Sequence, residues 1–166
     1  MSIHQTQTIV AFPFVFNRDF TATWRITPES KPDIMRIIDT HPEVPFFVKP
    51  LIHTLGIPDF RMKVSEDNRL LTLIIGIGPF QKTQKLHLGE FMWEGLFNRY
   101  PMHLALRPGE GRFFRVSGDI PSRGYSWFEY RVSDDGMRLS VNGAVPMRPG
   151  GTPFTLSCDF FMVDRT

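Results

Sequence analysis

Residues 154–163 read FTLSCDFFMV, and this stretch decides the fold class. Apolar side chains recur at every second position, at Phe154, Leu156, Cys158, Phe160 and Met162. Because successive side chains of a β-strand point to opposite faces, a period of two places this set on one face of a strand. The same period recurs in residues 137–142 and 60–65. The sequence therefore predicts a mainly β protein.

Turn-forming residues separate these stretches at short intervals. Asp67-Asn68 and Asp134-Asp135-Gly136 are typical of tight hairpin turns, and residues 146–153 (PMRPGGTP) of a longer one. Strands are expected near residues 20–26, 58–66, 69–77, 81–88, 91–98, 101–107, 112–118, 125–133, 137–145 and 154–163. Nearly ten antiparallel strands in so small a chain predict a barrel or a sandwich.

A helical segment follows the first predicted strand. Thr27 or Ser30 can cap a helix, because proline at the next one or two positions fits a first turn. Ile34, Ile37 and Ile38 then share one helix face.

A second helix is predicted over residues 47–55, where Phe47, Val48, Leu51, Ile52 and Leu55 have helical spacing. Gly56 is its expected C-terminal cap, and Pro50 is expected to kink or divide it. The pair would form a lid over about residues 28–56.

Composition limits the classes of function. The chain has 166 residues and is expected to fold as one domain over residues 1–166. A net charge of +2 predicts no nucleic-acid surface, and the lone Cys158 excludes an internal disulfide or a cysteine-rich zinc site. No stretch approaches the roughly 20 apolar residues that span a bilayer, and the N-terminus lacks the basic region of a signal peptide. We expect a cytoplasmic protein without stable membrane insertion.

Several short stretches resemble the intracellular lipid-binding proteins, the family of fatty-acid- and retinoid-binding proteins. Residues 22–25 (ATWR) are similar to the Gly-Thr-Trp-Lys of its first strand. Residues 80–83 (FQKT) and 86–90 (LHLGE) resemble its Phe-Lys-Asn-Thr and Phe-Gln-Leu-Gly-Glu segments, and residues 131–136 (RVSDDG) its Arg-Glu-x-x-Asp-Gly. The resemblance covers about residues 20–163 and implies a ten-stranded up-and-down β-barrel with a helix-turn-helix lid after the first strand.

The resemblance also implies a hydrophobic ligand inside the barrel, with Arg131 as a ligand-binding residue. The family ends with an Arg-x-Tyr pair that holds a carboxylate. With Cys158 aligned to the family's cysteine, Phe160 and Met162 stand at those two positions. Capture of a carboxylate in the family manner is therefore not expected.

The sequence does not determine which side chains of the strands predicted at 112–118 and 125–133 point into the barrel. Arg131 shares strand parity with Trp127 and Glu129, whereas Phe128, Tyr130 and Val132 form the opposite set. Either set could face the interior. Arg115 and Ser117 pose the same choice against Phe114 and Val116, and we name Arg131, Trp127 and Arg115 as candidate ligand contacts.

Apolar residues of the helical segment and of a nearby strand form a further candidate site. Phe46, Phe47, Leu51 and Ile52 would lie near Met92, Trp93, Leu96 and Phe97. In the resembling family they would flank the route by which ligand enters, and otherwise they would seal the barrel end. Phe47, Leu51 and Trp93 are the residues we assign to ligand contact.

Two functions follow from these patterns. The leading hypothesis is a carrier that binds a hydrophobic or amphipathic small molecule. The alternative is a cofactor-independent cyclase or isomerase acting on a polyketide- or terpenoid-like substrate, with Glu129 and His103 as catalytic groups. The five histidines show no metal-ligand spacing, so neither a metal nor a cofactor is expected.

Overall fold

A computed structural model describes residues 15–40, 47–76, 79, 81–94, 99–106, 111–121 and 123–165. Phe46, Leu96 and Phe97 of the predicted helical-end cluster lie outside these ranges, as do parts of the strands predicted at 69–77 and 91–98.

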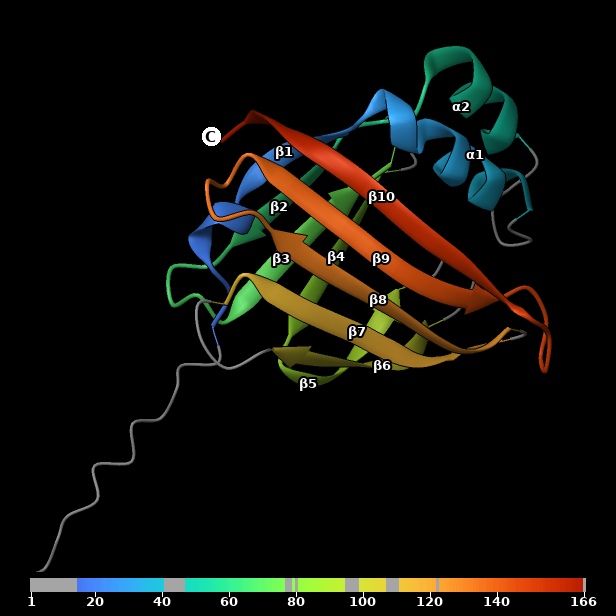
Figure 1. The fold of residues 1–166 in the computed structure, drawn as a ribbon. Coiled ribbons are helices and arrows are strands. Elements are labelled where there is room, and N and C mark those ends of the chain that lie inside the picture. The colour runs from blue at the N-terminus through green and yellow to red at the C-terminus, as the bar shows by residue number, and fades with distance from the viewer. Residues whose placement is uncertain are drawn as a thin grey trace, which may run out of the picture.

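Ten antiparallel strands form one sheet that curls into a nearly closed barrel, with a short helix pair after the first strand (Figure 1). The strand order is β4-β3-β2-β1-β10-β9-β8-β7-β6-β5, so strands consecutive in sequence are neighbours except β4 and β5, and β10 pairs with β1. The predicted fold class is confirmed. The strands are β1 (Ala22–Ile26), β2 (Phe60–Val64), β3 (Leu70–Ile75), β4 (Lys82–His87), β5 (Gly89–Glu94), β6 (Arg99–Leu106), β7 (Phe113–Ile120), β8 (Gly124–Val132), β9 (Arg138–Pro146) and β10 (Pro153–Asp164).

The barrel's seam lies between β4 and β5, the two ends of the strand order. The buried Gln84 side chain bridges it. Its amide nitrogen donates to the carbonyl oxygens of Lys85 at 2.9 Å and Met92 at 3.1 Å, and its oxygen accepts from the Glu94 N–H at 2.7 Å. One side chain thus supplies hydrogen bonds that a backbone ladder supplies elsewhere.

The helical segment comprises a 3-10 turn η2 (Pro28–Ser30), α1 (Lys31–Thr40) and α2 (Val48–Leu55). Gly56 ends α2 with φ 87°, and its N–H donates to Ile52 O at 2.8 Å, as predicted. The prediction that Pro50 kinks or divides the second helix is wrong. Because α2 begins at Val48, Pro50 lies in its first turn, where backbone N–H groups have no intrahelical acceptor.

Aromatic residues fill the barrel end opposite the helices. Phe16, Phe20, Trp24 and Phe114 are at most 1% exposed. The Phe114 ring centroid lies 5.4 Å from Phe16 and 5.2 Å from Phe20, in edge-to-face geometry, and Trp24 Nε1 donates to Phe20 O at 3.1 Å. We call these four residues the plug.

The plug sits on a short 3-10 turn, η1 (Arg18–Phe20), where the sequence predicted the start of a strand. Asp19 in this turn forms an ion pair with Arg112 at 2.8 Å, and Arg165 donates to Asp19 O at 2.9 Å. Two arginines distant in sequence therefore hold η1 against the barrel.

Candidate ligand-binding interior

Strand β8 settles which parity faces inward. Ser126 and Val132 are buried at 0% and 1% exposure, and Phe128 and Tyr130 share their parity. Arg131, on the other parity, is exposed, and its guanidinium lies 5.1 Å from the centroid of Phe113 on β7. Of the two facings left open by the sequence, Arg131 therefore takes the outward one, and the apolar set of β8 occupies the interior.

Arg115, Glu129 and Trp127 meet on the outer face instead. Arg115 Nη1 lies 3.1 Å from Glu129 Oε1, and the Arg115 guanidinium lies 4.7 Å from the Trp127 ring centroid. The register of β7 against β8 places Arg115 directly across from Glu129. Neither Arg115 nor Trp127 faces the interior, so the structure does not place them as contacts to an enclosed ligand.

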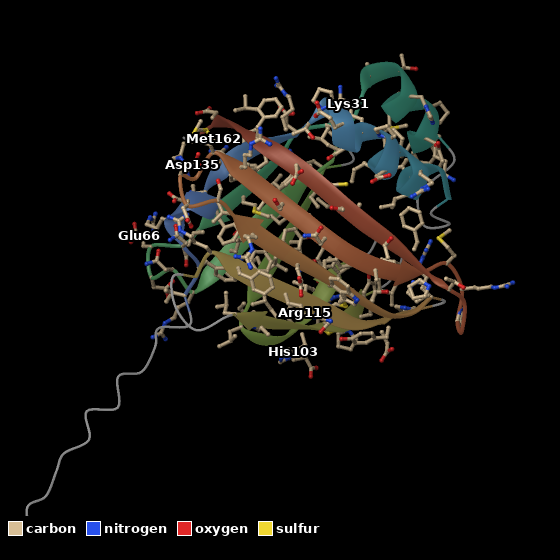
Figure 2. All side chains as sticks on the ribbon, in the orientation of Figure 1. Lys31, Glu66, His103, Arg115, Asp135 and Met162 are labelled. Atoms are coloured by element: carbon tan, nitrogen blue, oxygen red, sulfur yellow. The ribbon has the colours of Figure 1, made fainter. Side chains whose placement is uncertain are left out.

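His103 also lies outside the barrel. It is exposed on β6 between the buried Met102 and Leu104, and it pairs in register with Ser117 of β7. Figure 2 shows His103 and Arg115 on the outer surface. His103 and Glu129 are separated by the width of β7, so the structure does not bring the two candidate catalytic groups together at the interior.

Beyond the plug, inward-facing side chains keep part of their accessible surface. Some inward residues are sealed, such as Leu104 on β6 and Leu139 on β9 at 0% exposure. In contrast, several large apolar residues that pack against the core are only half-buried, namely Phe60, Trp93, Phe128, Tyr130 and Val145. Surface left on the inner face of a nearly closed sheet is available to a molecule inside the barrel.

Tyr130 is the polar member of this lining. Its ring lies parallel to Phe114, with an interplanar angle of 10° and centroids 4.6 Å apart. Burial raises the pKa of its phenol to about 12, so the group is neutral at physiological pH. Within the part of the chain that the structure describes, no hydrogen bond to its hydroxyl is found.

Cys158 belongs to the same inner face and is 1% exposed. Burial, followed by the negative charges of Asp33 and Asp159, raises the pKa of its thiol to about 12. Because the thiolate is the nucleophilic form, the raised pKa makes this thiol a poor nucleophile.

Arg123 is a buried residue that the sequence analysis missed. It lies in the turn between β7 and β8, at 2% exposure, and its Nη1 lies 3.4 Å from Pro146 O and 3.8 Å from Met147 S. The sequence carried no signal for its burial, since residues 121–124 (PSRG) read as an exposed turn.

The helix α2 exposes apolar side chains at the helical end of the barrel. Ile52 is buried at 8% exposure, whereas Phe47, Leu51 and Leu55 are 45%, 37% and 66% exposed. Trp93 on β5 is half-buried and packs against the core. Of the three predicted contacts, Phe47 and Leu51 thus lie on the surface of the helix pair, and Trp93 lies in the wall of the barrel.

A separate pocket of about 490 Å³ lies on the outer surface, where η2 meets β9 and β10. Its charged lining comprises Glu29, Arg138 and Asp159. Ser30 Oγ accepts from the Asp159 N–H at 2.9 Å, which fastens η2 to β10. This pocket is distinct from the inner face of the barrel.

In the described ranges, no three His, Cys, Asp or Glu side chains gather as a metal-binding group. None of the helices there is both long and apolar enough to cross a membrane.

No protein-family model matches the sequence, and no curated protein matches it. A solved structure described as "REP1-NXSQ fatty acid transporter" aligns with a TM-score of 0.63 and 11% identity, covering 88% of this chain and 97% of that chain. At this identity the likeness concerns the fold alone. It supports the ten-stranded barrel fold, and membership of the intracellular lipid-binding family stays a prediction.

Proposed function

We propose that this protein binds a hydrophobic or amphipathic small molecule inside its barrel. The observation that carries the proposal is the half-buried apolar surface on the inner face of a nearly closed sheet. Burial of a ligand's apolar surface there would contribute about 25 cal/mol per Å² before the costs of association. The fold it shares with a protein described as a fatty acid transporter supports the same class of ligand.

Phe47, Leu51 and Trp93 are proposed as residues that a ligand passes or contacts at the helical end. The plug closes the opposite end with buried aromatic rings, so the helical end offers the more easily opened route. The exposed apolar side chains of α2 would favour contact with an apolar ligand as it enters.

The outward positions of Arg131, Arg115 and Trp127 exclude them from this proposal. No observation favours the cyclase or isomerase alternative, because Glu129 and His103 lie on the outer face. A cytoplasmic location and the absence of a nucleic-acid partner stay predictions.

The test is a titration with the uncharged dye Nile red, followed by displacement with apolar ligands. Val141 faces inward and the adjacent Asn142 is exposed, so they form a matched pair on β9. Val141→Trp fills the interior and should weaken dye binding at least tenfold, whereas Asn142→Trp should leave it within about twofold. Circular dichroism controls for folding. Binding without saturation, or equal loss in both variants, would refute an interior site.

A further inference from the structure

The polar group of the ligand can be inferred from the one inward tyrosine of β8. This inference rests on the proposed function and specifies the ligand's chemistry. Tyr130 stacks on the sealed Phe114 of the plug, which places it at the deep end of the barrel, away from the helices. Its ring is half-buried, and its hydroxyl makes no hydrogen bond with the described residues.

A hydroxyl inside a protein strongly favours a hydrogen-bond partner, because its desolvation is otherwise uncompensated. The cross-strand neighbours of Tyr130 cannot supply one from their side chains, since they are Phe114 on β7 and Val141 on β9. A ligand atom that reaches the deep end would meet this hydroxyl.

The surroundings of Tyr130 also favour an uncharged ligand atom over an anionic one. Burial alone raises the pKa of Tyr130, with no contribution from a neighbouring charge, and Phe128 and Val141 share its inner face on β8 and β9. The cation at this end, Arg112, is already paired with Asp19 at 2.8 Å, so a carboxylate beside Tyr130 would be desolvated without a cationic partner of its own, which is costly. A hydroxyl or carbonyl oxygen needs one hydrogen bond, which the phenol can give or accept.

The buried cation Arg123 lies far from Tyr130. It is buried at the helical end, in the turn that precedes β8, whereas Tyr130 lies near the other end of that strand. At about 3.3 Å per residue, the two positions are well separated along the barrel.

We propose that the ligand is a long apolar molecule carrying an uncharged oxygen, such as an alcohol or a ketone, and that this oxygen hydrogen-bonds to the Tyr130 hydroxyl at the deep end of the barrel.

The test compares three ligands of equal chain length, dodecan-1-ol, dodecanoate and dodecane, as competitors of Nile red. The alcohol should displace the dye at a concentration at least tenfold lower than the acid. Tyr130→Phe keeps the ring and its stacking and removes only the hydroxyl. It should weaken dodecan-1-ol about fivefold, as expected for one hydrogen bond, and leave dodecane unchanged.

Tyr125→Phe is the matched control, because Tyr125 is the outward, 56% exposed tyrosine of the same strand. It should change none of the three affinities. If no ligand displaces Nile red, the proposed function itself fails. If dodecane and dodecanol bind and Tyr130→Phe alters neither, or if dodecanoate binds more tightly than the alcohol, the function stands and this inference is overturned.

Discussion

Tyr130 shows how one side chain couples the barrel interior to pH. Its pKa is raised to about 12 by burial, against about 10 in an unfolded chain. Below pH 10 the phenol is neutral in both states, so it adds no pH dependence. Between pH 10 and 12 only the unfolded state releases the proton, and the native state therefore loses stability as pH rises.

We predict that this loss is at most about 3 kcal/mol over that range, since each pKa unit corresponds to 1.36 kcal/mol. Urea unfolding at pH 9, 10 and 11 would measure it. Tyr130→Phe should reduce the decline relative to the unchanged chain. In absorbance titration at 295 nm, the variant should lack the component that ionises last. An identical pH profile for both proteins would contradict the burial of Tyr130.

The facing of β8 could not be predicted from its own residues. Both parities contain aromatic side chains, and the charges of Glu129 and Arg131 gave the only contrast. The deciding partner, Arg115, lies on the neighbouring strand and pairs with Glu129 outside. A cross-strand pair depends on register, which residue periodicity in one strand does not determine.

Among the elements, the hairpin turns were predictable because their chemistry is local. Asn68 adopts φ 61° and Gly136 φ 71°, and Asp67 and Asp135 each accept hydrogen bonds within their own turns. The same holds for Gly56 at the end of α2. In contrast, the burial of Arg123 depends on what surrounds its turn, and the turn sequence does not encode that.

Gln84 gives a prediction at the level of the β4–β5 seam. Gln84→Leu removes three hydrogen bonds and leaves the Met92 carbonyl and the Glu94 N–H without the partner they have now. We expect a loss of about 1–3 kcal/mol in the free energy of unfolding. Hydrogen exchange at the Glu94 amide should also accelerate.

Gln81→Leu is the matched control, because Gln81 is exposed and precedes the same strand. Its effect should stay within about 0.5 kcal/mol. If both variants behave alike, or the Glu94 amide remains protected in Gln84→Leu, the side-chain bridge does not hold the seam.

For the whole molecule, the order of strands and helices was readable from the sequence, and the plug was not. Residues before the first strand carried no periodic pattern, so Phe16 gave no sign that it would be 1% exposed beneath the barrel. Its burial depends on contacts with Phe20 and Phe114 and on the hydrogen bond from its N–H to Asn68 O, at 2.7 Å. Two of these partners, Phe114 and Asn68, are distant in sequence, so local residue patterns do not reveal them.

We predict that Phe16→Ala lowers the free energy of unfolding by about 3–5 kcal/mol, the usual cost of removing a buried aromatic ring. Phe161→Ala, at a position 37% exposed on the outer face of β10, should cost far less. Equilibrium denaturation of the two variants would make the comparison. Similar losses in both would mean that Phe16 does not seal the barrel.

The plug has a consequence for how the proposed ligand would be exchanged. Because the plug and the Arg112–Asp19 ion pair close one end of the barrel, the proposed ligand would enter and leave at the helical end. A bound ligand would then have to leave before a second one could enter, so an excess of competitor would not displace it directly. Off-rates measured in chase experiments should accordingly be independent of the concentration of the chasing molecule.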